Sequence, residues 1–173
     1  KNTGYALDVI LDSSPFTPDA KPLNVAQLLA GSEGTLAFAT AMKLNLTPLP
    51  PKEKAVICAH FETLEDALKA NITALKFNPG AVELMDDQIL DLTAGNFLQV
   101  QNRFFVKGNP GAILVIEFTR DTREEIEQLA AEMEGALRGE NLGYHFPIIF
   151  GPSDIAKVWD LRRSALGLLA NMP

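Results

Sequence analysis

The segment Ala55-Val-Ile-Cys-Ala-His-Phe61, with Thr63-Leu-Glu-Asp66 close behind it, decides the fold because a strand signal runs directly into a helix start. A continuous apolar run of this length is typical of a buried strand. Thr63 and Asp66 have the spacing of a capping box, which marks the first turn of a helix. Apolar residues then recur at helical spacing up to the breaker Asn78-Pro79-Gly80; they are Leu64, Leu68, Ile72 and Leu75.

The same order occurs a second time further along the chain. Residues 112–118 predict a strand, Thr122 and Glu125 a capping box, and the stretch behind them a helix. The apolar stripe of this helix consists of Ile126, Leu129, Ala130, Met133, Ala136 and Leu137. A short strand is expected after each helix, at 81–85 and at 143–150. Two βαβ units in tandem predict an α+β fold, a ferredoxin-like βαβ-βαβ sandwich with both helices on one face of an antiparallel sheet.

The segments between and after the two units are less regular. We expect a short helix over 86–93 and an irregular or extended stretch over 98–107. After Gly151-Pro152, Ser153 is a suitable N-cap for a last helix over 154–169. Apolar residues cover one broad arc of this last helix, and a charged residue falls within that arc.

That charged residue is Arg162, which lies one turn from Trp159. A guanidinium keeps its charge in a protein, so on an apolar face it needs an acidic partner or access to water. In the structural interpretation, Arg162 snorkels to water or pairs with a carboxylate of the protein, for which Glu83 and Glu117 are candidates. In the functional interpretation, its partner is a substrate carboxylate held in a bidentate fork.

The first 50 residues differ in texture from the rest. Three prolines precede a short helical stretch at 25–29, a glycine motif, and an expected strand from about Thr35 to Leu46. The prolines at 48, 50 and 51 can neither continue a helix nor join a central strand, so they predict an extended link between domains. We therefore expect a fragment of one domain at 1–50 and a second domain at 51–173.

Composition and charge narrow the class of protein. A hydrophobic fraction of 47% and a charged fraction of 21% are typical of soluble globular proteins. The net charge of -7 argues against a nucleic-acid partner, because phosphate binding needs clustered Lys and Arg. No apolar run approaches the roughly 20 residues that span a bilayer, and no secretion signal opens the sequence. We expect a cytoplasmic protein without a membrane span.

The nucleophilic and titratable side chains form no catalytic arrangement of their own. Cys58 lies inside the apolar run, where a buried, inert thiol is expected rather than a nucleophile. His60 and His145 also lie in apolar strands, and we expect both to be structural. No spacing resembles a zinc site, so no metal ligands are assigned. On these residues alone, a non-catalytic, small-molecule-binding domain of ferredoxin-like fold stays open as an alternative.

Three short motifs carry a resemblance to a known family: Asn2-Thr-Gly-Tyr5, Gly31-Ser-Glu-Gly-Thr35 with the segment behind it, and Trp159-Asp-Leu-Arg162. In this order they resemble the FAD-linked oxidases of the vanillyl-alcohol oxidase superfamily, in the branch of the D-lactate, glycolate and D-2-hydroxyglutarate dehydrogenases. The resemblance spans nearly the whole chain. It implies a fragment of a flavoenzyme: the tail of the FAD-binding domain at 1–50 and a truncated substrate or cap domain at 51–173.

The resemblance also implies roles for particular residues. The flavin would lie against residues of the first two motifs and the segment after them, namely Asn2, Thr3, Gly4, Tyr5, Gly31, Ser32, Glu33, Gly34, Thr35, Phe38 and Ala39. Arg162 would hold the substrate carboxylate, and Trp159 would shape the pocket wall. The parent protein would transfer a hydride from carbon 2 of a small D-2-hydroxy acid to FAD and pass the electrons to a separate acceptor. Some relatives carry an iron–sulfur module outside the part that this chain covers.

Overall fold

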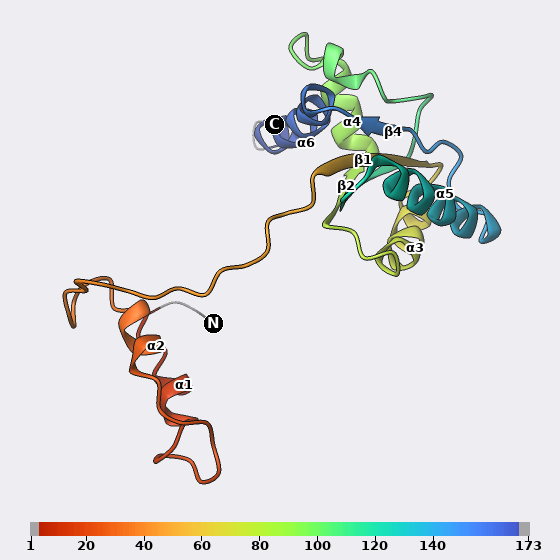
Figure 1. Ribbon diagram of the computed structural model, residues 1–173. Coiled ribbons are helices and arrows are strands. Elements are labelled where there is room, and N and C mark those ends of the chain that lie inside the picture. The colour runs from red at the N-terminus through yellow and green to blue at the C-terminus, as the bar shows by residue number, and fades with distance from the viewer. Residues whose placement is uncertain (1–3, 170–173) are drawn as a thin grey trace. The chain divides into compact units, whose positions relative to one another are not determined.

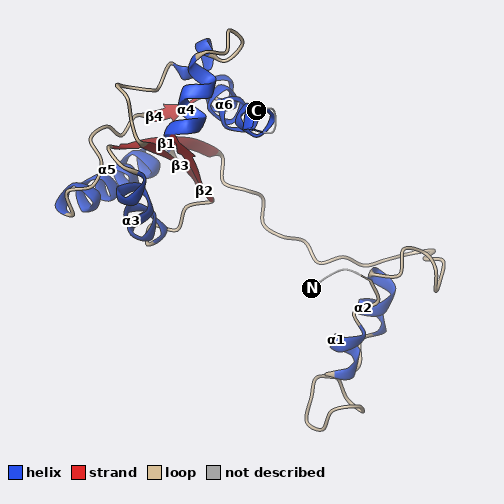
Figure 2. Ribbon diagram, turned by 180° about the vertical axis from the view of Figure 1, so that it is seen from behind, coloured by secondary structure: helices blue, strands red, loops and turns tan. Residues whose placement is uncertain are grey.

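The computed structural model describes residues 4–169, apart from the side chains of 165, 166, 168 and 169. The chain divides into two compact units, Lys1–Pro48 and Leu49–Pro173. Figure 1 shows the helices and strands of each unit, and Figure 2 shows them from behind. Within residues 4–169, no helix combines the length and the apolar character that crossing a membrane requires.

A four-stranded antiparallel sheet forms the centre of the second unit, with the strands in the order β2-β3-β1-β4. The strands are β1 (Glu53–Phe61), β2 (Ala81–Asp86), β3 (Ala112–Arg120) and β4 (Ile148–Phe150). Ile57 of β1 lies opposite Ile116 of β3 on one side and Ile148 of β4 on the other. This strand order, with helices between the strands, confirms the predicted ferredoxin-like α+β fold.

Helices cover both faces of this sheet (Figures 1 and 2). They are α3 (Leu64–Leu75) and α5 (Arg123–Gly139) on one face, and α4 (Asp87–Ala94) and α6 (Pro152–Leu169) on the other. Alternate residues of β1 point to opposite faces, so Ile57 joins the cluster under α3 and α5, whereas Val56 and Cys58 join the cluster under α4 and α6. Because both faces are buried, β1 is apolar at consecutive positions.

The helix starts follow the predicted capping chemistry in two of three cases. Thr122 and Glu125 form a complete capping box at α5. At α3, the Thr63 side chain accepts the N–H of the third helical residue, as an N-cap does. The predicted N-cap at Ser153 is wrong, because α6 begins at Pro152. A proline is favoured at the first helical position, where its missing N–H would have no partner within the helix.

The segment between the two βαβ units is helical and irregular, as predicted. The helix expected over 86–93 is α4, and the stretch 98–107 contains a short 3-10 helix, η1 (Val100–Arg103). The Arg103 side chain donates to the Leu90 carbonyl and to the Thr93 hydroxyl. These two hydrogen bonds hold η1 against α4.

The last strand is shorter than the predicted 143–150. β4 has three residues, and an isolated bridge between His60 and His145 precedes it. Pro147 lies between the bridge and the strand and has no N–H to donate, so the ladder is interrupted there.

The apolar residues that recur at helical spacing on α3 lie on its solvent side, although such a stripe usually faces a core. The side chains that pack against the sheet and α5 are small: Ala67, Ala70 and Ala74 are fully buried. The large ones, Leu64, Leu68, Ile72 and Leu75, are exposed by 43%, 54%, 65% and 54%. In α5, by contrast, four of the predicted stripe positions are buried: Ile126, Ala130, Met133 and Leu137.

The first unit contains two short helices, α1 (Leu7–Leu11) and α2 (Val25–Ala30), of which only α2 was expected. The predicted strand from Thr35 to Leu46 is wrong, because that segment is irregular and exposed throughout. A strand needs a partner that completes its hydrogen-bond ladder. Among residues 4–48, the single pairing is an isolated bridge between Ser14 and Pro22, so no sheet exists there for the segment to join.

Candidate functional site

The glycine motif at 31–35 folds as a tight turn directly after α2. Glu33 and Gly34 both have positive φ angles, 50° and 77°, in the left-handed region that glycine tolerates best. The Ser32 hydroxyl donates to a carbonyl of α2, and the Thr35 hydroxyl donates to the Ser32 carbonyl. The turn is therefore held by hydrogen bonds to its own backbone rather than by an apolar core.

The structure brings the first two motifs together. A Cβ atom added to Gly31 would lie 1.9 Å from the Gly4 carbonyl oxygen, so only glycine permits this approach. The hydroxyl oxygens of Tyr5 and Thr35 are 2.8 Å apart. Because the Thr35 hydroxyl already donates to a backbone carbonyl, the Tyr5 hydroxyl is the donor in this pair. Two segments far apart in the sequence are thus joined at two points.

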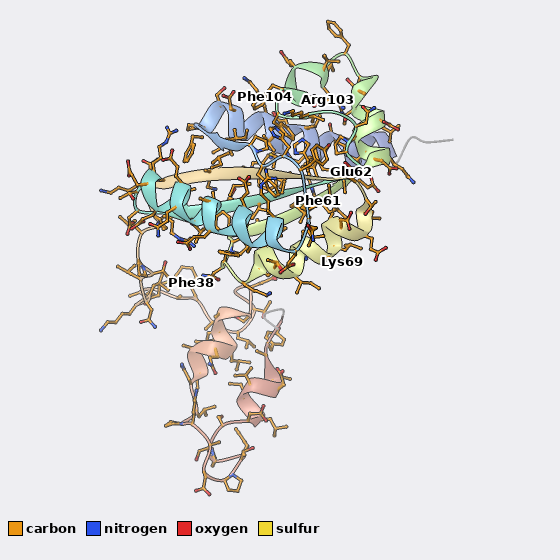
Figure 3. The ribbon with its side chains drawn as sticks, turned by 90° about the vertical axis from the view of Figure 1, so that its right-hand side faces the viewer. Phe38, Phe61, Glu62, Lys69, Arg103 and Phe104 are labelled. Atoms are coloured by element: carbon orange, nitrogen blue, oxygen red, sulfur yellow. The ribbon has the colours of Figure 1, made fainter. Side chains whose placement is uncertain are left out.

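A hollow of about 470 Å³ runs along the segment that follows the turn. Gly34, Phe38 and Ala39 are among the residues that line it. Phe38 is 92% exposed, and Figure 3 shows its place on the first unit. Small neighbours leave the backbone accessible, and the exposed ring offers a face on which a planar group can stack. Asn2 and Thr3, which the resemblance assigns to the same site, lie outside the described residues.

On α6, Arg162 forms an ion pair with Glu83 of β2, in which Nη2 and Oε2 are 2.7 Å apart. The side chains are 31% and 39% exposed, so the pair lies at the edge of the cluster under α6 and reaches water. Glu83 is one of the two carboxylates named in the structural interpretation. The other, Glu117, pairs with Lys54 instead. The described contact engages one of the five N–H donors of the guanidinium.

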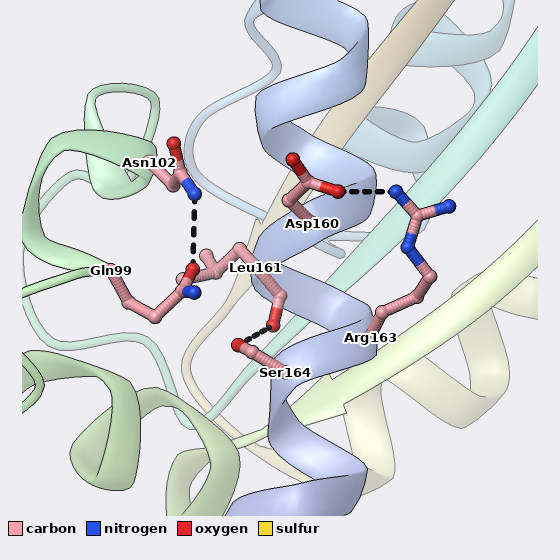
Figure 4. Close-up of polar contacts among 6 residues, drawn as sticks. All are labelled: Gln99, Asn102, Asp160, Leu161, Arg163 and Ser164. Carbon is pink, nitrogen blue, oxygen red and sulfur yellow. Dashed lines mark hydrogen bonds and ion pairs between the residues drawn. The ribbon is translucent and has the colours of Figure 1, made fainter.

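Trp159 lies on α6, one turn before Arg162. It lines an open hollow of about 600 Å³ at the start of α6. The cationic residues around this hollow are Lys52, Lys54 and Arg163. Figure 4 shows that Arg163 pairs with Asp160 on the side of α6 turned away from η1. Sequence reasoning missed this hollow, because nothing in the motifs indicated that the start of β1 lies beside the first turns of α6.

Two buried side chains are structural, as predicted. Cys58 is fully buried, and burial raises the pKa of its thiol, which keeps it protonated and unreactive. The Nδ1 atom of His60 lies 2.7 Å from the Cys58 carbonyl oxygen, and its Nε2 accepts the Lys107 N–H at 3.2 Å. Nδ1 therefore carries the proton, and burial lowers the pKa of His60 to about 4.

Among the described residues, no group of three or more His, Cys, Asp and Glu could hold a metal ion.

The sequence of this chain is similar to one known protein family and to several dehydrogenases. The family described as FAD linked oxidases, C-terminal domain, matches residues 50–172. The D-2-hydroxyglutarate dehydrogenase of Pantoea ananatis is 27% identical over 98% of this chain and 17% of its own length. The enzyme of the same name from Haemophilus influenzae is 28% identical with the same coverage. The mitochondrial D-lactate dehydrogenase (cytochrome) of Arabidopsis thaliana is 25% identical over 92% of this chain and 27% of its own length. The chain thus spans between about a sixth and about a quarter of the length of these curated relatives.

Proposed function

The chain belongs to the FAD linked oxidases, C-terminal domain family, and from this premise we propose that it forms part of a flavoenzyme that oxidises a small D-2-hydroxy acid. In this proposal, residues 1–50 are the tail of the FAD-binding domain and residues 51–173 are the substrate or cap domain. The names of the relatives, D-2-hydroxyglutarate and D-lactate dehydrogenase, support this class of substrate. The electrons leave to a separate acceptor. The comparisons give no support to an iron–sulfur cluster.

The observation that carries the proposal is the contact between the two glycine motifs. Gly4 and Gly31 lie so close together that only glycine fits at position 31, and the hydrogen bond between Tyr5 and Thr35 joins the two motifs a second time. Nothing lies within 4 Å of the place where a side chain would begin at Gly34, so the turn presents open backbone beside the hollow. These features fit a large, planar cofactor that needs close backbone approach. When bound, the flavin supplies the redox chemistry by accepting a hydride.

On the substrate side, Arg162 binds the carboxylate of the hydroxy acid, and Glu83 holds the guanidinium in place. The Glu83 contact restrains the orientation of the planar fork, which makes the remaining N–H donors more specific for a carboxylate. Because the pair is partly exposed, a small anion can reach it. Trp159, one turn earlier and packed on the cluster under α6, forms the wall beside it.

The proposal is tested by the turnover of D-2-hydroxyglutarate and of D-lactate by the full-length protein with an artificial electron acceptor. Arg162→Lys keeps the charge but loses the fork, so kcat/KM should fall about tenfold to a hundredfold, equivalent to roughly 1.5 to 3 kcal/mol. Flavin content should not change. Arg163→Lys is the matched control, because Arg163 is exposed and pairs within its own helix; its activity should stay within about twofold. Full activity of Arg162→Lys with a lower melting temperature would show that the pair with Glu83 is structural.

The second candidate function is a non-catalytic, small-molecule-binding domain, which the hollow beside Trp159 favours. Flavin binding separates the two candidates. A full-length protein that carries FAD and reduces it with a hydroxy acid supports the oxidase. The 173-residue chain alone should hold no FAD, because a flavin site buries the cofactor between many elements and few of them are present here. A chain that purifies yellow at stoichiometric occupancy would contradict that expectation.

A further inference from the structure

The open hollow of about 600 Å³ at the start of α6 has an apolar floor and a cationic rim. On the floor, Ile155 is buried and Trp159 is partly buried, and both pack in the cluster under α6. The rim carries three cationic side chains, which are those of Lys52, Lys54 and Arg163. An apolar surface with a small number of charged groups at its edge is typical of a site for a small organic molecule.

The alternation of β1 directs Lys54 toward this hollow. Val56 and Cys58 belong to the cluster under α4 and α6, so Lys54, two residues before Val56, points to the same face of the sheet. Glu53 also borders the hollow, but alternation directs its side chain to the opposite face, where Arg120 of β3 is its cross-strand neighbour. The side chain that β1 turns toward the hollow is therefore cationic.

The ion pairs around the rim leave one positive charge unmatched. The Nζ atom of Lys54 lies 2.9 Å from Oε1 of Glu117, and Arg163 pairs with Asp160, as Figure 4 shows. Among the residues that the structure describes, Lys52 forms no ion pair. A ligand with a single negative charge would therefore balance the rim.

We infer that this hollow binds a monocarboxylate that carries an aromatic ring. Lys52 supplies the charge for the carboxylate, and the unused N–H groups of Lys54 and Arg163 donate hydrogen bonds to it. The ring stacks on the indole of Trp159. A phosphate dianion would bring a second negative charge, for which the rim has no further unmatched cation. The inference deepens the second candidate function by naming its ligand, and it holds whether or not Arg162 binds a hydroxy acid.

Phenylacetate is the probe that tests the site. Trp159 is the single tryptophan, so its indole N–H gives one signal in a proton–nitrogen NMR correlation spectrum. Phenylacetate should shift this signal with a dissociation constant of about 1 mM, as expected for a small ligand in an open hollow. The absence of a shift at about ten times that concentration would overturn the inference.

Three related compounds separate the ring from the charge. Phenylacetamide has the ring without the charge, and acetate has the charge without the ring, so each should bind at least about fivefold more weakly than phenylacetate. Phenyl phosphate, with its additional charge, should bind no more tightly than phenylacetate. Equal binding of phenylacetamide or of acetate, or clearly tighter binding of phenyl phosphate, would overturn the assignment to an aromatic monocarboxylate.

Matched substitutions locate the charge that holds the carboxylate. Lys52→Gln should raise the dissociation constant of phenylacetate about fivefold and leave that of phenylacetamide unchanged. The fold should not change, because Lys52 is exposed. Lys76→Gln is the control, since Lys76 is an exposed lysine at the end of α3, on the other face of the sheet; it should change neither constant.

Arg162→Gln separates this inference from the proposed oxidase. Arg162 pairs with Glu83 on β2, so its loss should leave the binding of phenylacetate in the hollow unchanged. If Arg162→Gln weakened binding and Lys52→Gln did not, phenylacetate would bind at the carboxylate site of the proposed oxidase. This inference would then fail, while the proposed function would stand.

Discussion

The two units of the chain differ in the side chains that they bury, which are mainly apolar in the second unit and polar in the first. The second unit has two apolar clusters, one on each face of its sheet. In residues 4–48, the buried side chains are those of Ser13 and Ser32, and both hydroxyls donate to backbone carbonyls. Hydrophobic burial therefore holds the second unit, whereas turns and hydrogen bonds hold the first. The difference shows that the glycine motifs at 4–5 and 31–35 can have a defined local shape without an apolar core beneath them.

Hydrogen exchange should show the largest contrast between the units. β1 and β3 pair over nine residues at the centre of the sheet, so their amides should exchange only when the whole unit unfolds. For a domain of this kind the protection corresponds to roughly 5 to 15 kcal/mol. The amides of residues 5–19 should exchange far faster, because their hydrogen bonds lie at an exposed surface with no apolar core behind them. Equal protection in both units would break the comparison, because it would show that the first unit has a stable core of its own.

Two phenylalanines provide matched probes of burial, and Figure 3 labels both. Phe61 is fully buried in the cluster under α3 and α5, so Phe61→Ala should lower the free energy of unfolding by about 3 to 5 kcal/mol. Phe38 is almost fully exposed in the first unit, and Phe38→Ala should change it by less than about 0.5 kcal/mol. Urea unfolding followed by circular dichroism measures both. Similar costs at the two positions would mean that Phe38 is buried in solution.

His60 should make the second unit sensitive to acid. Burial lowers its pKa from 6.5 to about 4, so the unfolded chain binds a proton that the folded chain does not between these values. The free energy of unfolding is therefore unaffected by this group above pH 6.5. It decreases as the pH falls from 6.5 to about 4, by about 3 kcal/mol in total. The fluorescence of Trp159, the single tryptophan, reports unfolding of this unit. His60→Gln should flatten this part of the pH profile. An unchanged slope in that variant would assign the effect to other groups.

The success of the fold prediction follows from local signals that agree with each other. β1 and β3 are apolar runs, and a helix with an N-cap follows each of them in the sequence. Both strands are buried in the sheet, so the local signal and the tertiary structure agree. The expected strand at 35–46 failed because strand formation depends on a partner, which a single segment cannot specify. The large apolar residues of α3 recur at helical spacing, but this spacing does not show which side of the helix packs against the core. Small alanines allowed the opposite side to pack closely.

The candidate site was predictable as a set of residues but not as an arrangement. The order of the sequence motifs identified both Gly4 and Gly31 as site residues. Their contact could not be predicted, because it depends on the path of the chain between them. Likewise, either Glu83 or Glu117 could have paired with Arg162. The choice depends on the sheet, because Lys54 lies beside Glu117 on the neighbouring strand and takes that carboxylate.

The smallest effects should come from two glycine substitutions, one in each unit. Gly135 lies in α5 with nothing within 4 Å of an added Cβ, so Gly135→Ala should stabilise the second unit by about 0.5 to 1 kcal/mol through helix propensity alone. Gly31→Ala should leave the unfolding of that unit unchanged, as measured by Trp159 fluorescence. Its Cβ would lie 1.9 Å from the Gly4 carbonyl oxygen, so the two motifs must separate.

That separation is visible at the hydrogen bond between Tyr5 and Thr35, which cannot survive a displacement of more than a few tenths of an ångström from its 2.8 Å length. NMR chemical shifts of these two residues should therefore move in Gly31→Ala and stay in place in Gly135→Ala. If Gly31→Ala also destabilised the second unit, the units would be energetically coupled, and the contrast between them would have to be abandoned. If instead the shifts of Tyr5 and Thr35 did not move, the motifs would not be in contact in solution, and the flavin half of the proposed function would lose its structural support.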